Sequence, residues 1–188
     1  MIQGLRDLIT QTHELLDGRG VPHAFGGAIA LGYHAESRAT LDADVNIFVG
    51  KGDVREVVAA FTDIDMHPEA DASEWLLMAG VRLVHTELPL RLDLFFSLDD
   101  SYEQVRERIV SGPFGPDGGT IPILSVEDLT TFKLSFNRPK DWMDLSQLVE
   151  HHPTMDIDQI EHMLGHLRGP TMAPRIARLR ALLRQARP

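Results

Sequence analysis

The chain has 188 residues, of which 43% are hydrophobic and 24% are charged, and its formal net charge at pH 7 is −10. This composition suits one compact domain, or a small domain with a helical extension. The chain has no cysteine, which excludes disulfides and thiolate metal sites, so a metal would need oxygen or nitrogen ligands. No apolar stretch approaches the roughly 20 residues of a membrane span, and the first residues do not resemble a secretion signal. We therefore expect a soluble cytoplasmic protein without membrane contact.

The negative net charge argues against general binding of nucleic acid, but the charges are unevenly placed. No acidic residue follows Glu161, whereas arginines continue to the end of the chain. They are Arg168, Arg175, Arg178, Arg180, Arg184 and Arg187. This basic segment could bind an anionic partner, or it could be a solvated helix whose arginines lie along the protein surface.

Apolar spacing and turn residues predict alternating helices and strands in the first two-thirds of the chain. In chain order, we expect a helix at 2–16, a strand at 21–25, a helix at 28–35, a buried strand at 42–50 and a helix at 53–61. There follow strands within 75–80, 81–87 and 90–97, a helix at 99–110, a Gly- and Pro-rich loop at 111–120 and a strand at 121–124.

The last third of the chain has a helical pattern, with helices expected at 125–136, 138–152, 155–167 and 174–185. Ser125 is the expected N-cap of the first of these, with Asp128 in a capping-box position, and Pro139 suits the first turn of the second. The order of elements predicts an α+β fold. A mixed sheet flanked by helices would occupy residues 1–124, and a helical region would follow at 125–188.

Asp42 and Asp44 lie two residues apart on a predicted strand, so their side chains project from the same face. Val45 and Ile47 would point to the opposite, buried face. Two neighbouring carboxylates repel and raise each other's pKa unless a cation lies between them. Mg²⁺ or Mn²⁺ would meet that need, because Mg²⁺ is bound by carboxylates, water and substrate phosphates.

A third carboxylate, Asp93, lies in the otherwise apolar strand at 90–97, where an unpaired charge would be costly. Three acidic groups around two metal ions could bind a triphosphate and activate a hydroxyl for in-line displacement. Simpler explanations exist for each residue. Asp42 could cap a turn, with Asp44 paired to Arg38. Asp93 could likewise pair with Arg91.

Gly26 and Gly27 lie between a predicted strand and the start of a predicted helix. Their amides and the N-terminus of the helix could receive phosphate oxygens, because no Cβ stands in the way. A short helix followed by the extended residues 38–44 could then bring the acidic strand back beside this phosphate-binding turn.

These residues together resemble the nucleotidyltransferase superfamily of the DNA polymerase β type. The resemblance consists of a glycine pair, the pattern R-x-T-x-D-x-D followed by an apolar strand, and a solitary Asp in a later strand. The matching positions are Gly26, Gly27, Arg38, Thr40, Asp42, Asp44 and Asp93. In this superfamily the second small residue of the turn is often Ser.

The resemblance implies a role for each matching residue. The glycines would cradle the β- and γ-phosphates of a nucleoside triphosphate (NTP), and Arg38 and Thr40 would brace the turn or contact phosphate. Asp42 and Asp44 would hold two Mg²⁺ ions. Asp93 would bind the catalytic ion and help to deprotonate the acceptor hydroxyl.

Residues 124–149 are similar to the AbiEii-like minimal nucleotidyltransferases, in which D-L-x-x-x-K precedes R-x-x-D-x-x-D-L. Members of that branch include toxins of toxin–antitoxin and phage-defence systems. The similarity implies that Lys133 contacts the nucleotide phosphates. It also implies that four further residues shape or close the site, with Asp141 close to the nucleotide. They are Arg138, Lys140, Asp141 and Asp144.

Local interactions could also account for these charges. Lys133 could form a salt bridge with an acidic neighbour, for which the choices are Glu127, Asp128 and Asp141. Asp141 and Asp144 could stabilise the N-terminus of their own helix. We expect the nine histidines to be structural or solvated, and Trp75 and Trp142 to be core or domain-contact residues and not a platform for base stacking.

The resulting hypothesis is an enzyme that moves a nucleoside monophosphate from an NTP to a hydroxyl acceptor and releases pyrophosphate. The acceptor would be an RNA 3′ end such as that of tRNA, a small molecule such as an antibiotic, or a protein hydroxyl. A toxin of this type would have a cognate antitoxin protein as a partner. Two alternatives are a non-catalytic nucleotide- or partner-binding regulatory protein on the same fold, favoured by Gly27 in place of Ser, and a metal-dependent phosphohydrolase.

Overall fold

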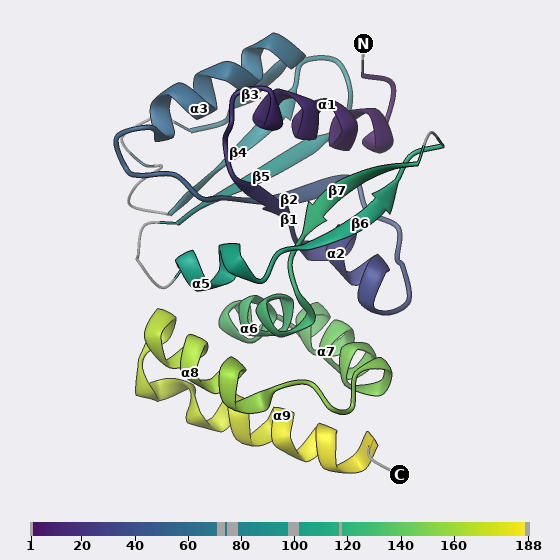
Figure 1. Ribbon diagram of the computed structural model, residues 1–188, viewed down its shortest axis with the longest axis vertical. Helices are drawn as coiled ribbons and strands as arrows, with labels where there is room; N and C mark the ends of the chain where they lie inside the picture. Colours follow the sequence, from purple (N-terminus) through teal and green to yellow (C-terminus); the bar gives the residue numbers. More distant parts are fainter. Residues whose placement is uncertain (1, 71–73, 75–78, 98–101, 117, 187–188) are drawn as a thin grey trace.

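A mixed seven-stranded sheet forms the centre of the N-terminal part of the protein (Figure 1). The computed structural model describes residues 2–70, 74, 79–97, 102–116 and 118–186. The strand order is β3-β4-β5-β2-β1-β7-β6. The strands are β1 (His23–Phe25), β2 (Asp42–Ile47), β3 (Met66–Pro68), β4 (Gly80–His85), β5 (Arg91–Phe96), β6 (Val110–Phe114) and β7 (Gly119–Ile123).

Helices cover the sheet and continue beyond it as a separate layer (Figure 1). They are α1 (Leu5–Asp17), α2 (Gly27–His34), α3 (Val54–Ala60), α5 (Tyr102–Glu107), α6 (Val126–Phe136), α7 (Pro139–His151), α8 (Ile157–Arg168) and α9 (Ala173–Ala186), with short 3₁₀ helices η1 (Phe61–Ile64) and η2 (Pro170–Met172). α1 and α3 lie on one side of the sheet, and α2 and α6 to α9 lie on the other. The predicted α+β fold, a mixed sheet flanked by helices with a helical C-terminal part, is confirmed.

β2 is the strand that positions the site, and it lies in the middle of the sheet between β5 and β1. It pairs with β5 in parallel and with β1 in antiparallel orientation. Val45 and Ile47 are fully buried, as the predicted alternation requires. Strands paired on both sides are held firmly in place, so the side chains on the opposite face of β2 have fixed positions.

The prediction of a loop at 111–120 is wrong, because most of these residues belong to a β-hairpin formed by β6 and β7. The Gly and Pro residues that suggested a loop are tolerated because β6 is an edge strand, where an amide can be missing. Gly112 is required for packing, because a Cβ there would lie 2.7 Å from Cε1 of Tyr33. The Tyr33 hydroxyl also donates to the Pro113 carbonyl at 2.7 Å.

Two further differences concern element boundaries. The helix predicted at 99–110 is described only as α5, and β6 begins at the last residue of that range. β3 was not predicted from the sequence. Residues 75–78 of the strand predicted at 75–80 lie outside the described residues, as does Trp75. Among the described residues, no helix has both the length and the apolarity needed to cross a membrane, and the cytoplasmic location stays a prediction.

Every described strand precedes residue 124, and α6 to α9 follow it. α6 contacts α7 and α8, α7 contacts α9, and α2 contacts both α6 and α7. Ser125 caps α6, as predicted, by accepting a hydrogen bond from the Asp128 amide at 3.2 Å. The division into a catalytic domain at 1–124 and a helical region at 125–188 stays a prediction.

The arginines of α9 mostly contact the protein itself. The guanidinium of Arg178 lies 3.7 Å from the ring centre of Trp142, which is buried, as predicted, between α7 and α9. Arg175 donates to the carbonyls of Leu134 and Ser135 at 2.7 and 2.9 Å. These contacts hold α9 against α6 and α7, which favours a structural role for this basic segment over an anion-binding one.

Candidate active site

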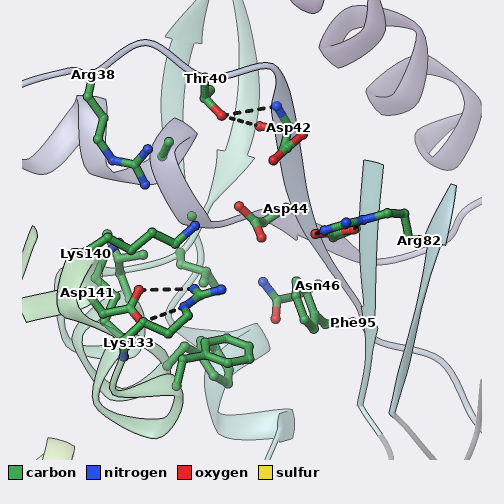
Figure 2. Close-up of a pocket in the computed structure, with 18 residues that line it drawn as sticks. Arg38, Thr40, Asp42, Asp44, Asn46, Arg82, Phe95, Lys133, Lys140 and Asp141 are labelled. Atoms are coloured by element: carbon green, nitrogen blue, oxygen red, sulfur yellow. Dashed lines mark hydrogen bonds and ion pairs between the residues drawn. The ribbon is translucent and has the colours of Figure 1, made fainter. Parts of the chain in front are cut away.

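One pocket gathers the chemically distinctive residues of the chain (Figure 2). It is lined by residues of β2, β4 and β5 on the sheet side, by α6 and α7 on the helical side, and by the first turn of α2. The charged residues that line it are Arg38, Asp42, Asp44, Arg82, Asp93, Lys133, Arg138, Lys140 and Asp141. The pocket therefore combines carboxylates on the sheet with a larger number of cations around them.

The three predicted strand carboxylates face this pocket. Asp44 of β2 and Asp93 of β5 lie directly opposite each other in the parallel register, so their side chains leave the sheet on the same face. Asp42 precedes Asp44 by two residues on that face. Burial, and next the negative charge of Asp93, raise the pKa of Asp44 to about 6. The site thus holds one carboxylate whose charge is costly without a cation.

The simpler explanation of Asp44 as a partner of Arg38 is wrong. Arg38 instead binds Asp144 of α7, with distances of 3.3 Å from Nε to Oδ1 and 3.4 Å from Nη2 to Oδ2. Asp44 has no hydrogen bond or ion pair of its side chain with any described residue. The positive charges of Lys133, Lys140 and Arg138 lie near enough to lower its pKa, but none of them forms an ion pair with it.

Asp93 is paired with an arginine, but not with the neighbour in sequence. Arg82 of β4 lies opposite Asp93 in the antiparallel β4–β5 register. Its Nε and Nη2 donate to Oδ1 and Oδ2 of Asp93, both at 2.7 Å. The predicted alternative of an Arg91–Asp93 pair is wrong, since Arg91 lies on the side of Asp42 instead, with 3.9 Å between Nη1 and Oδ1.

Asp42 lies in a turn-like arrangement with Thr40. The Thr40 hydroxyl accepts from the Asp42 amide at 3.1 Å and donates to the Asp42 carbonyl at 3.0 Å. These bonds fix the backbone and leave the Asp42 carboxylate free for other contacts. Oδ1 of Asp42 is buried and has no hydrogen-bond partner. Thr40 therefore braces the start of β2.

The carboxylates fit a hard divalent cation in chemistry, but they are not gathered around one point. Within the described ranges, no group of three or more His, Asp and Glu side chains has the arrangement of a metal site. Oδ1 of Asp42 has no hydrogen bond and only a long ion pair with Arg91, and the pKa of Asp44 is raised, so both carboxylates could accept a further cation. Mg²⁺ prefers such ligands, so Asp42 and Asp44 suit it as they stand, and Asp93 suits it once Arg82 moves away.

The glycine turn leads directly into α2 and touches Asp44. Gly27 has φ +53°, and a Cβ at this position would overlap Oδ2 of Asp44. Ser at this position, common in the resembled superfamily, would therefore displace the carboxylate here. The Gly26 amide donates to the Asp44 carbonyl at 2.8 Å, so it is not free for a phosphate. The free donors at this turn are the first amides of α2.

Lys133 of α6 is buried, and its Nζ donates to Oδ2 of Asp144 at 2.6 Å. The partners predicted from the sequence are wrong because Asp144, which lies on the facing turn of α7, takes this role. Asp144 also forms an ion pair with Arg38, so one buried carboxylate holds two cations beside the pocket. This pairing fixes both cations next to the carboxylates of the sheet.

The start of α7 contributes a capping box to the pocket wall. The Asp141 carboxylate accepts from the Arg138 amide at 2.9 Å and from the Arg138 guanidinium at 2.8 and 3.1 Å. Stabilisation of the helix N-terminus by Asp141 is thus confirmed, and its proposed contact with a nucleotide stays a prediction. Lys140 extends towards Asp44 without an ion pair to any described residue (Figure 2).

Several pocket residues were not predicted. Asn46 shares the face of Asp42 and Asp44, which the alternation of β2 could have indicated. Arg82 reaches Asp93 only through the register of β4 and β5, for which the sequence has no local signal. The remaining additions are apolar. They include Phe95, Leu124, Leu129, Phe132 and Phe136.

The fold of this chain is similar to that of several solved structures, which include an antibiotic adenylyltransferase. The antibiotic-resistance factor ANT(2'')-Ia in solution aligns with 89% of this chain and 93% of its own, at 13% identity and a TM-score of 0.61. The lincosamide antibiotic adenylyltransferase LnuA with bound lincomycin aligns with 77% of this chain and 96% of its own, at 15% identity and a TM-score of 0.57. ANT(2'')-Ia with adenylyl-2''-tobramycin aligns with 93% of this chain and 96% of its own, at 16% identity and a TM-score of 0.54.

No protein-family profile matches the sequence, and no curated protein matches it either. The identities to the solved structures are low, so these likenesses describe the fold. The chain has the nucleotidyltransferase fold, as its sequence motifs predicted. Its assignment to the AbiEii-like branch stays a prediction.

Proposed function

We propose that the protein is an NTP-dependent nucleotidyltransferase that moves a nucleoside monophosphate to a hydroxyl group. The observation that carries this proposal is the position of Asp44 and Asp93, opposite each other in one pocket beside the glycine turn. Cationic side chains of α6 and α7 face these carboxylates across the pocket. A triphosphate bound in the pocket would neutralise these cations. The nucleotidyltransferase fold of the chain supports the same chemistry.

In the proposed reaction, the acceptor oxygen attacks the α-phosphorus of the NTP. A new O–P bond forms, the bond from the α-phosphorus to the oxygen bridging to the β-phosphate breaks, and pyrophosphate leaves with the bonding electrons. The proton of the acceptor hydroxyl passes to the carboxylate of Asp93. Since both oxygens of Asp93 accept from Arg82 in this structure, Arg82 must release Asp93 before the proton can be taken.

Mg²⁺ bound by Asp42, Asp44 and Asp93 would neutralise the phosphate charges that develop during transfer. The protein's own part is to hold the reactants in line. Lys140 lies free beside Asp44 and is placed for the phosphate chain, while Lys133 and Arg38 are held near it by Asp144. The first amides of α2 point to the same region.

We propose a small hydroxylated molecule as the acceptor. Two of the structural relatives named above act on or bind antibiotics, which supports this choice. An RNA end is less well supported, because most arginines of α9 are engaged in contacts with α6, α7 and α8. A toxin with a cognate antitoxin would need such an RNA or protein acceptor.

A second candidate is a non-catalytic nucleotide-binding protein. The observation that favours it is the Arg82–Asp93 pair, because a permanent pair would deprive the site of its third carboxylate. In that case NTP would bind and no pyrophosphate would be released.

Both candidates can be separated by one assay. The protein is incubated with each α-labelled NTP and Mg²⁺, together with an aminoglycoside, a lincosamide or total tRNA. Enzymatic function predicts label transfer and pyrophosphate release that disappear in Asp44→Asn and persist in Asp63→Asn, which alters an exposed surface pair with Arg19. NTP binding with no release for any acceptor would instead support the binding protein.

A further inference from the structure

Asn46 is a buried polar residue whose side chain has no partner in the part of the chain that the structure describes. It is 5% exposed, and it lines the pocket two residues after Asp44 on the same face of β2. Its amide is not among the fully enclosed polar atoms that lack a partner, so it still faces the open space of the pocket. A polar side chain at a pocket wall that bonds to no described residue is available to a ligand.

The position of this amide relative to the glycine turn identifies the part of a ligand that it meets. Nδ2 of Asn46 lies 3.1 Å from the position that a Cβ would take on Gly26, and Asp44 lies in the same way against Gly27. Asn46 thus lies against Gly26, and Asp44 lies against Gly27. Figure 2 shows Asn46 next to Asp44 on the side of Phe95.

The turn lacks a donor at the place where Asn46 lies. The Gly26 amide is already bound to the Asp44 carbonyl, so only the amides from the start of α2 are free for an anion. An Asn side chain carries two N–H donors on one nitrogen. Asn46 can therefore supply the hydrogen bonds that the Gly26 amide does not.

We propose that Asn46 binds a phosphate oxygen of the nucleotide at the glycine turn. This inference rests on the proposed function, since it assigns a residue to the phosphate chain of the same NTP. Phosphate is the chemical group that fits, because the free amides of α2 and the uncommitted ammonium of Lys140 surround the same space. The apolar side chains Phe95 and Leu124 line the pocket together with Asn46.

Asn46→Leu tests this role, because Leu has nearly the same size and no polar atoms. Removing an amide that bonds to no described residue leaves the melting temperature of the ligand-free protein unchanged or raises it. The affinity for ATP with Ca²⁺ and the affinity for inorganic tripolyphosphate both fall, by the same factor of about ten, which corresponds to about 1.4 kcal/mol. Asn46→Thr keeps a hydroxyl donor and recovers part of the loss. Ile47→Val, on the opposite face of β2, leaves both affinities unchanged.

Calorimetric titrations and thermal melts of the full chain distinguish the outcomes. If Asn46→Leu weakens ATP but not tripolyphosphate, the amide reads the nucleoside and the proposal is overturned. If the variant melts at a lower temperature and keeps both affinities, Asn46 is structural and the proposal is equally wrong. If the wild-type protein binds neither ATP nor tripolyphosphate, both this inference and the proposed function fail. If the wild-type protein binds both ligands but the affinities of the Asn46 variants do not change as expected, only the role of Asn46 is rejected and the proposed function stands.

Discussion

Arg82 and Asp93 form a bidentate ion pair that joins β4 to β5 at the edge of the pocket, with two N–O distances of 2.7 Å. The Arg82 side chain is 42% exposed, and the Asp93 side chain is 20% exposed. Bidentate geometry favours the pair, whereas solvent weakens it, so it contributes about 1 kcal/mol. A divalent cation that binds Asp93 has to replace this contact. Arg82 is thus a competitor of the metal for the third carboxylate.

Arg82→Ala should therefore lower the Mg²⁺ concentration at half-saturation, by a factor of about five for a pair worth about 1 kcal/mol. The measurement is a Mg²⁺ titration of NTP binding at constant ionic strength. Arg19→Ala, which removes the exposed pair with Asp63, should not change the half-saturating concentration. A higher Mg²⁺ requirement in Arg82→Ala would show that Arg82 assists ligand binding and does not compete with the ion.

Gly27→Ala should damage both folding and activity. The residue has φ +53°, where a side chain is strained, and its Cβ would overlap the Asp44 carboxylate. We expect a loss of about 2–3 kcal/mol in unfolding free energy, since strain and overlap add. Transfer activity should fall at least about 100-fold, because a misplaced Asp44 carboxylate would no longer hold the metal ion that neutralises the phosphates.

Gly20→Ala is the matched control for that substitution. Gly20 has φ +64°, and no atom lies within 4 Å of the position of its Cβ. The Gly20→Ala variant should lose about 1 kcal/mol of unfolding free energy through backbone strain alone and should keep its activity. Equal losses in both variants, measured by urea denaturation and pyrophosphate release, would contradict the role assigned to the contact between Gly27 and Asp44.

The carboxylates of the pocket were open to prediction because their signals are local. Alternation along one strand is enough to place Asp42 and Asp44 on a common face, and Asp93 stands out as a charge within an apolar strand. The phosphate turn was likewise visible from Gly26 and Gly27. These features depend on only a few consecutive residues.

Their partners were not open to prediction, because they depend on how distant segments pack. Asp144 takes Lys133 from the facing helix and Arg38 from a loop 106 residues away in sequence. Arg82 meets Asp93 only because β4 and β5 pair in one particular register. The β6–β7 hairpin was missed for a related reason, since an edge position in the sheet makes proline and glycine acceptable within a strand.

Asp144→Ala should destabilise the protein strongly. The Asp144 side chain is 5% exposed and neutralises Lys133, whose side chain is 6% exposed. Removing one partner of a buried pair leaves the other charge uncompensated, at a cost of about 3–5 kcal/mol. The unfolding free energy in urea gives this value. The double variant Lys133→Met with Asp144→Leu should recover most of the loss, because it removes both buried charges. A loss below about 1 kcal/mol in Asp144→Ala would show that the pair is not buried in solution.

The pKa of Asp44 makes the stability of the metal-free protein depend on pH. Burial and the nearby charge of Asp93 raise it from 3.8 to about 6 in the folded state. Between these values the folded protein holds a proton that the unfolded chain has released. The free energy of unfolding therefore falls as the pH rises through this window, and it levels off above about pH 6. The total loss attributable to Asp44 is on the order of 1–3 kcal/mol.

Asp44→Asn should lack this decrease, because its side chain does not ionise. Thermal melts in EDTA from pH 4 to pH 7.5 should show the variant gaining stability relative to the wild type as the pH rises. At pH 7.5 the variant should be the more stable protein, and it should have no transfer activity. Adding Mg²⁺ should raise the melting temperature of the wild type at pH 7.5 and leave the variant almost unchanged, since the ion needs the ionised carboxylate. A constant difference between the two proteins across this pH range would mean that Asp44 is already ionised, with a cation partner, in the metal-free fold.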